Sequence, residues 1–160
     1  MKSFLEYRIE KLIPDPHIPV DLEAVCARLD IAVEEREMIP EAVMQVAGGR
    51  FQIFLQSNFR HTPVARLRQR FSLAHELGHT LFYDRENGAI RPRKDSPRGD
   101  NLEHACHKAA SMILIPSKVL HQELKRHPPV DAGSVVELAK AIRSFGGGNA
   151  SEAARCGRLR

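Results

Sequence analysis

The sequence predicts an α+β domain in which a small β-sheet is surrounded mostly by helices. Apolar residues recur at helical spacing in segments near the N-terminus and throughout the second half of the chain. Between them lie two β-prone runs, 42–47 and 51–56, separated by Gly48-Gly49. A chain of 160 residues fits one domain with a substantial core. We therefore predict a single domain over residues 1–145, followed by a Gly-rich C-terminal segment, 146–160, that frays.

The first third of the chain is predicted to contain two helices and a strand. Residues 1–13 have helical apolar spacing, and Pro14 and Pro16 end that helix. Residues 19–29 form a second helix, and 31–35 a short strand. The apolar residues with this spacing are Phe4, Leu5, Ile9 and Leu12 in the first helix, and Leu22, Val25, Cys26 and Leu29 lie along one side of the second. Cys26 is therefore predicted to be a core residue.

A hairpin and a long loop are predicted on either side of the central helix. Gly48 and Gly49 can both take positive φ, which a tight turn between strands requires, so 42–47 and 51–56 form the hairpin. Residues 84–101 are polar and rich in Gly and Pro, which is typical of a loop. This loop either borders a cleft and touches substrate or is an exposed connection.

The second half of the chain is predicted to be helical. A helix from about Leu102 to Ile115 ends at Pro116, and Ser117 caps another that runs to about His127. A capping-box pattern, 134–137, opens a helix through about Phe145, where three glycines end it. A short terminal helix begins at about residue 151 and frays.

Composition and charge narrow the functional class. The net charge is +4 and the sequence pI is about 9.2, with arginines clustered at 60–70 and basic residues at 91–98. Three interpretations of these basic residues are open: a solvated surface, a surface that steers a substrate, and a contact surface for nucleic acid. No apolar run approaches the ~20 residues that span a bilayer, and the start lacks a signal peptide, so we expect a cytoplasmic protein without a membrane partner. The three cysteines form no Cys-x-x-Cys pair and are expected to be reduced, structural thiols.

The stretch that carries chemistry is His75-Glu-Leu-Gly-His79. Residues four apart share one helix face, so His75 and His79 can both bind one metal ion, with Glu76 at the rim of the same site. Thr62 as N-cap and Pro63 as first residue start this helix, whose apolar stripe is Val64, Leu67, Phe71, Ala74, Leu77 and Leu81. The alternative is two surface histidines on an amphipathic helix. We favour a zinc hydrolase, in which Glu76 is the catalytic base.

A catalytic zinc needs a third protein ligand. A metzincin continuation is excluded, because Phe82 and Arg85 stand where that class needs glycine and a ligand. The remaining common solution is a glutamate from a later helix, and Glu103 is our prediction. Alternatively, Asp100 and Glu103 form a capping arrangement. His104 and His107 are rival ligands; His107, four residues after Glu103, is better placed to support the site by hydrogen bonding or to face the substrate oxyanion.

These motifs resemble the ImmA/IrrE family of bacterial metallopeptidases. The resemblance covers most of residues 18–145 and rests on 68–79, on Glu103 through Pro116, and on Ile18–Leu22 with Leu29–Val33. This chain differs from the family pattern at Cys106, His107 and Ala109. The resemblance implies a zincin-like fold of the gluzincin type and regulated cleavage of a cognate helix-turn-helix repressor.

The sequence thus predicts an endopeptidase with one Zn²⁺ per chain, held by His75, His79 and Glu103. An edge strand near Phe51–Gln56 aligns the substrate by β-addition. The alternative is an antirepressor that contains zinc, binds protein and breaks no bond. DNA binding is a third reading, through a helix-turn-helix-like pair at 137–143 and 151–155, and the glycine-rich connection at 146–148 disfavours it.

Overall fold

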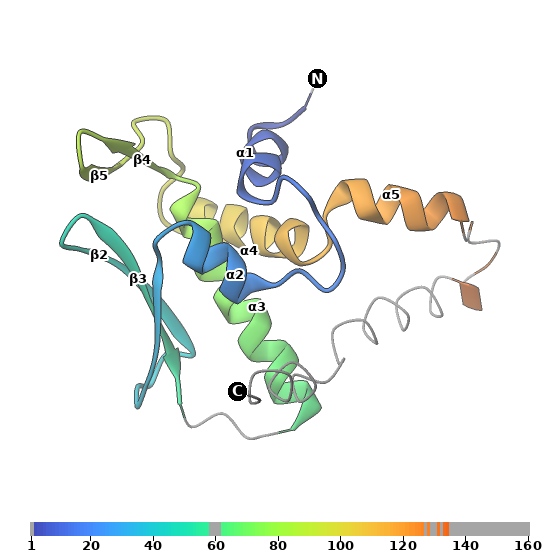
Figure 1. The fold of residues 1–160 in the computed structure, drawn as a ribbon, viewed down its shortest axis with the longest axis horizontal. Helices are drawn as coiled ribbons and strands as arrows, with labels where there is room; N and C mark the ends of the chain where they lie inside the picture. The colour runs from blue at the N-terminus through green and yellow to red at the C-terminus, as the bar shows by residue number, and fades with distance from the viewer. Residues whose placement is uncertain (1, 58–61, 127, 129–130, 132, 135–160) are drawn as a thin grey trace, which may run out of the picture.

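The computed structural model describes residues 2–57, 62–126, 128, 131 and 133–134 (Figure 1). Several predictions concern residues outside these ranges. They are the helix from 134 to 145 beyond its first residue, the segment 146–160, the DNA-binding pair and Cys156. The elements are α1 (Phe4–Leu12), α2 (Leu22–Arg28), β1 (Ala32–Arg36), β2 (Ala42–Ala47), β3 (Arg50–Gln56), α3 (Pro63–Thr80), β4 (Tyr83–Glu86), β5 (Ala89–Pro92), α4 (Asp100–Leu114) and α5 (Ser117–Arg126). The fold is α+β, as predicted.

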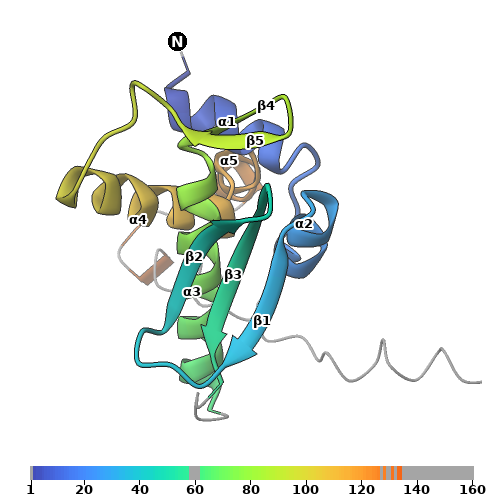
Figure 2. The ribbon, with the colours of Figure 1, turned by 90° about the vertical axis from the view of Figure 1, so that its left-hand side faces the viewer.

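Strand order in the main sheet is β1-β3-β2. β2 and β3 form the predicted antiparallel hairpin, with Met44 opposite Ile53, whereas β1 pairs in parallel with the other side of β3. The expectation that β3, residues Phe51–Gln56, is an edge strand is therefore wrong. Parallel pairing with β1 puts β3 in the centre, and β2 becomes the edge on the side of α4 (Figure 2).

The core lies between one face of this sheet and α3. Ile53 and Leu55 alternate onto the buried face, while Phe54 points to the other face, where the Arg36 guanidinium covers its ring at 3.9 Å. α3 packs on the sheet with its C-terminal half, and α4 packs on α3 (Figure 1). Buried residues of both helices are Leu73, Ala74, Leu77, Cys106, Ala109, Ala110 and Ile113. The sheet and α4 thus hold α3 from two sides.

α3 begins as predicted but buries less of its apolar stripe. Thr62 accepts a hydrogen bond from the Ala65 backbone N–H at 3.2 Å, and Pro63 is the first helical residue. Val64 and Leu67 remain 75% and 42% exposed. The stripe prediction is wrong at these two positions, because the residues that the helix buries run only from Ser72 to Thr80.

The loop predicted over 84–101 is wrong in its first half, which forms the hairpin β4–β5. Asn87 and Gly88 take φ of 51° and 76°, the pair of positive values that a type I′ turn needs. The Arg93 guanidinium contacts the Asp84 carboxylate at 2.7 Å, and Arg8 donates to the Tyr83 carbonyl at 2.9 Å. Arg8 thus ties the hairpin to α1, while Arg93 links β4 to the residues that follow β5.

Cys26 is buried in the core, as predicted, and Ile9 and Leu12 of α1 are buried too, whereas Phe4 is 41% exposed. Cys106 is also buried, and burial raises the pKa of the Cys26 thiol to about 11 and that of Cys106 to about 12. Both thiols are thus protonated and inert at neutral pH, as expected of structural cysteines. Within the described part of the chain, no helix is long and apolar enough to cross a membrane.

Candidate metal centre

Two helices bring the three predicted metal ligands together. His75 and His79 lie one turn apart on α3, and Glu103 lies in the first turn of α4. The Nε2 atoms of the two histidines are 3.2 Å apart. The Glu103 carboxylate places one oxygen 3.1 Å from His75 Nε2 and the other 3.6 Å from His79 Nε2. Sequence positions 28 residues apart therefore form one cluster.

The spacing of these donor atoms fits a zinc ion. Zinc binds nitrogen and carboxylate oxygen at ~2.0–2.2 Å in tetrahedral geometry, so neighbouring ligand atoms lie about 3.3 Å apart. The separations of 3.1, 3.2 and 3.6 Å scatter around that value. Two imidazoles and one carboxylate are also the donor set of many catalytic zinc sites. Glu103 is 54% exposed, so the cluster opens to solvent on its side and leaves room for water.

Close packing of α4 on α3 fixes these ligands relative to each other. A Cβ atom at Gly78 would lie 3.1 Å from the Cys106 carbonyl oxygen and 3.2 Å from the Ala109 Cβ. Both distances are tighter than ordinary van der Waals contact, so a side chain at Gly78 would push the helices apart. The glycine between the two histidines is thus explained by the approach of the helix that carries Glu103.

Burial keeps both histidines in the neutral form that a metal requires. Desolvation lowers the pKa of His75 and of His79 below the ordinary value of 6.5, and a neighbouring imidazole lowers each further. The Glu103 charge opposes both shifts. The His75 Nδ1 atom is buried without a hydrogen-bond partner among the described residues. Packing therefore orients this ring: the rings of His79 and His107 lie 4.9 and 4.6 Å from it.

Glu76 is buried beside the cluster and is not one of its three ligands. Burial raises the pKa of its carboxyl group to about 7, a hydrogen bond with the Met44 backbone opposes the rise, and the charge of Glu103 adds to it. A carboxyl group whose pKa lies near neutrality can both accept and release a proton. The residue predicted as the base thus has the environment of a proton shuttle.

The rival roles in α4 are resolved for Glu103 and His104. The N-cap is Gly99 with φ of 54° and no side-chain cap, so the capping arrangement of Asp100 with Glu103 is wrong. His104 is exposed and lies outside the cluster. His107 borders the cluster through its contact with His75 and does not join it. Its expected role in supporting the site or facing the substrate stays a prediction.

Among the described residues, a pocket lies at the metal cluster, and a larger one lies elsewhere. The pocket at the cluster has a volume of about 350 Å³, and its lining residues are Glu41, Ala42, Arg68, Phe71, Ser72, His75, Glu76 and His107. No sequence motif marks Glu41, which reaches the pocket from the turn before β2. Arg68 and Ser72 could have been suspected, since they lie on the same face of α3 as His75.

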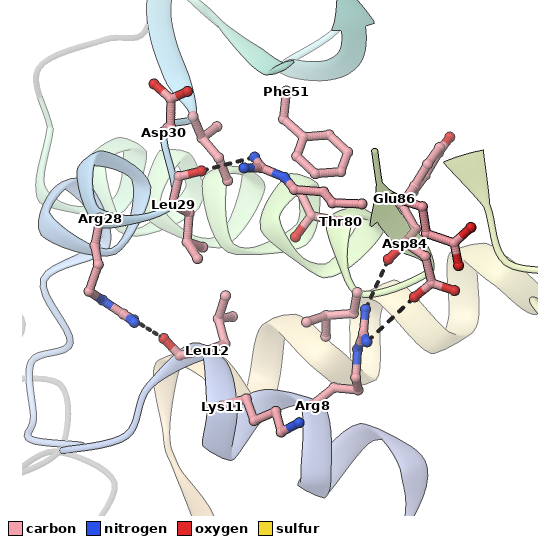
Figure 3. A pocket seen from close by; sticks show the side chains of 14 residues that line it. Arg8, Lys11, Leu12, Arg28, Leu29, Asp30, Phe51, Thr80, Asp84 and Glu86 are labelled. Atoms are coloured by element: carbon pink, nitrogen blue, oxygen red, sulfur yellow. Dashed lines mark hydrogen bonds and ion pairs between the residues drawn. The ribbon is translucent and has the colours of Figure 1, made fainter. Parts of the chain in front are cut away.

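The larger pocket, about 680 Å³, lies between α1, the end of α2 with the turn after it, the end of α3 and β4 (Figure 3). Its arginines are tied to backbone carbonyls. Arg8 donates to Tyr83, Arg28 to Leu12 and Arg85 to Leu29. These guanidinium groups join the walls of the pocket to each other. None of the three residues of the metal cluster lines it, whereas His75 lines the smaller pocket.

We predict that zinc affinity is nearly constant from about pH 8 to about pH 6.5 and falls at lower pH. Protons compete with zinc for the imidazoles, and the lowered pKa of His75 and His79 moves this competition below their ordinary value. A competition titration with a zinc chelator at several pH values measures the effect. A decline in affinity that already begins above pH 6.5 would contradict the lowered pKa of the two histidines.

The sequence of the chain is similar to a known family and to two characterised proteins. Residues 50–142 match the family described as the IrrE N-terminal-like domain, peptidase M78. The chain is 36% identical over 77 residues to the radiation response metalloprotease IrrE of Deinococcus radiodurans, and 32% identical over 77 residues to that of Deinococcus deserti. The alignments cover 46% of this chain, but 23% and 27% of those two proteins. The chain thus spans about a quarter of the length of the curated relatives it matches.

Proposed function

Because this chain belongs to the metallopeptidase family of the IrrE N-terminal-like domain, we propose that it is a zinc-dependent endopeptidase with a gluzincin-like fold. The convergence of His75, His79 and Glu103 beside the buried Glu76 carries the proposal. One zinc ion per chain fits the cluster. Bound there, it lowers the pKa of a water molecule and polarises the scissile carbonyl.

The residues of the chain supply positioning and proton transfer. Glu76 accepts the proton of the attacking water and delivers it to the nitrogen of the leaving amine. Its burial keeps bulk water from competing for this proton. The Met44 backbone, on the neighbouring strand, favours the ionised form of this carboxylate. His107, on the wall of the same pocket, faces the bound peptide and is our candidate for hydrogen bonding to its developing oxyanion.

The peptide is proposed to bind along the edge strand β2. An extended peptide can add to a sheet through backbone hydrogen bonds, and β2 is the edge next to α3 and the metal cluster. This replaces the expectation that β3 has that role, since β3 already pairs on both sides. Addition to β2 brings the peptide backbone alongside Glu76.

The proposed substrate is a helix-turn-helix transcriptional repressor in the cytoplasm. This part of the proposal rests on the resemblance to the ImmA/IrrE family. The curated relatives carry the description of a radiation response metalloprotease, which is compatible with a regulatory protease.

Incubation with a helix-turn-helix repressor from the same genome tests this function. The zinc-loaded protein is expected to yield a small number of defined fragments by mass spectrometry, and a chelator is expected to prevent their formation. The antirepressor alternative predicts a stable complex of the two intact proteins. That outcome, seen by size-exclusion chromatography with zinc bound, would refute proteolysis of this repressor.

A further inference from the structure

The pocket beside Glu76 extends away from the metal cluster along α3. Its inner end is formed by His75 and Glu76. Arg68 and Ser72 precede these residues by one to two turns on the same helix face. Glu41 and Ala42, at the start of the edge strand, complete the outer part. A side chain that enters this pocket therefore belongs to a peptide residue next to the scissile bond.

One wall of the pocket is aromatic. The rings of Phe71 and His107 are stacked with their centroids 5.8 Å apart and an interplanar angle of 21°. The two rings come from α3 and α4, so the contact between these helices sets their positions. Such a surface can pack along the aliphatic stem of a long side chain.

The outer part of the pocket contains a carboxylate that is fixed in place. One Glu41 oxygen lies 3.1 Å from the Ser72 hydroxyl, whose proton is shared with the Arg68 backbone carbonyl at 3.1 Å, and the other oxygen forms an ion pair with the Arg68 guanidinium. The Glu41 side chain is 33% exposed, whereas that of Arg68 is 68% exposed. The negative charge thus belongs to the pocket wall, and its cationic partner is a long, mostly solvated side chain that can turn away.

These charges distinguish among substrate side chains. An acidic side chain would approach Glu41, which disfavours it. An apolar side chain would pack on the aromatic wall but would form no interaction with the charge of Glu41 or of Arg68. A basic side chain would pack its stem on Phe71 and replace the Arg68 guanidinium on Glu41, while Arg68 returns to water at little cost.

We infer that this pocket receives a lysine or arginine side chain of the substrate, next to the scissile bond, and that Glu41 determines this specificity. The inference rests on the proposed peptidase function. It concerns a substrate preference set by the Glu41–Arg68 pair, which lies outside the metal cluster.

Short synthetic peptides with randomised central residues test this inference. The zinc-loaded protein cleaves the library, mass spectrometry identifies the cleaved bonds, and individual peptides then carry lysine, norleucine or glutamate on either side of the bond. Norleucine has the stem of lysine without its charge, so the ratio of kcat/KM values for the two isolates the ion pair. We expect a preference of about tenfold for lysine at one position, and glutamate to be the poorest residue there.

Two variants of one ion pair should shift this ratio in opposite directions. Glu41→Gln removes the charge that recognises lysine and is expected to lower the ratio about tenfold. Arg68→Gln removes the competing cation and is expected to raise it. Glu10→Gln breaks a comparable exposed pair with Lys2 on α1 and should leave the ratio as in the parent. Thermal denaturation of each variant checks that the fold is intact.

Peptide affinity for the zinc-loaded Glu76→Gln protein, measured by fluorescence anisotropy, separates this inference from the proposed function. Cleavage without a preference for basic residues, or an equal loss for all peptides in Glu41→Gln, would overturn the inference and leave the peptidase. If lysine peptides bind more tightly than norleucine peptides but the parent protein cleaves neither, the specificity of the pocket is supported and the proposed peptidase function is overturned. Neither cleavage nor selective binding would overturn both.

Discussion

The Glu76→Gln variant is expected to bind zinc as the parent does and to cleave its substrate at least ~100-fold more slowly, because general acid–base catalysis contributes ~10²–10⁴ in rate. Glutamine keeps the size of the side chain and its place beside the cluster but cannot accept a proton. Rates on a cleaved peptide, with zinc content measured by elemental analysis of the same sample, give the result. Full activity in this variant would disprove the role of Glu76.

Folding stability provides the control for this variant. The pKa of Glu76 is raised from 4.5 to about 7, so the folded state prefers the protonated carboxyl group. Its contribution to stability is present below about pH 4.5 and is lost as the pH rises through about 7. Glutamine is neutral at every pH, and the metal-free variant should therefore melt at or above the temperature of the metal-free parent at pH ~8. Lower stability would mean that lost activity reflects damage to the fold.

Local signals explain why α3 and the β2–β3 hairpin could be predicted from the sequence. Thr62 and Pro63 provide the cap and first residue of α3 within a few positions. Gly48 and Gly49 adopt the positive φ values, 57° and 73°, that the turn requires. The spacing of His75 and His79 is equally local, because one turn of helix separates them. Each of these features depends on residues that are near each other in the chain.

Long-range pairing explains the errors. The strand order β1-β3-β2 depends on a parallel contact between β1 and β3, which no turn signal marks. The β4–β5 hairpin did carry a signal, Asn87-Gly88, but its strands are short and charged. It is held by Arg8 and Arg93, and the sequence does not show that these side chains reach it. Polar composition therefore indicated a loop where tertiary contacts form a hairpin.

The candidate site divides in the same way. Three of its residues belong to one helix motif, and Glu103 required only the assumption that a later helix supplies a carboxylate. Glu41 reaches the pocket from the turn before β2, and its contact with Ser72 spans 31 positions. The sequence thus identified the chemistry that the site can perform. The structure was needed to show which side chains surround a bound substrate.

Loss of either ligand, in Glu103→Ala or His79→Ala, is expected to weaken zinc binding by more than the ~10–100-fold that removal of a supporting partner costs. The parent should purify with about one zinc per chain, since three donors satisfy a catalytic site with one open position. Elemental analysis measures this content, and competition with a chelator measures the affinity. Zinc should also raise the melting temperature of the parent and have little effect on either variant, since a ligand stabilises the fold only when it binds.

His104→Ala is the matched control for these ligand variants. His104 adjoins Glu103 on α4 and is a potential metal ligand by chemistry, yet it is exposed and outside the cluster. Its removal should leave zinc content and the zinc-dependent rise in melting temperature as in the parent. Equal losses in His104→Ala and Glu103→Ala would mean that α4 contributes through its fold or through a different ligand. A parent that takes up no zinc after reconstitution would mean that the three donors converge without binding this metal, and would favour the protein-binding alternative.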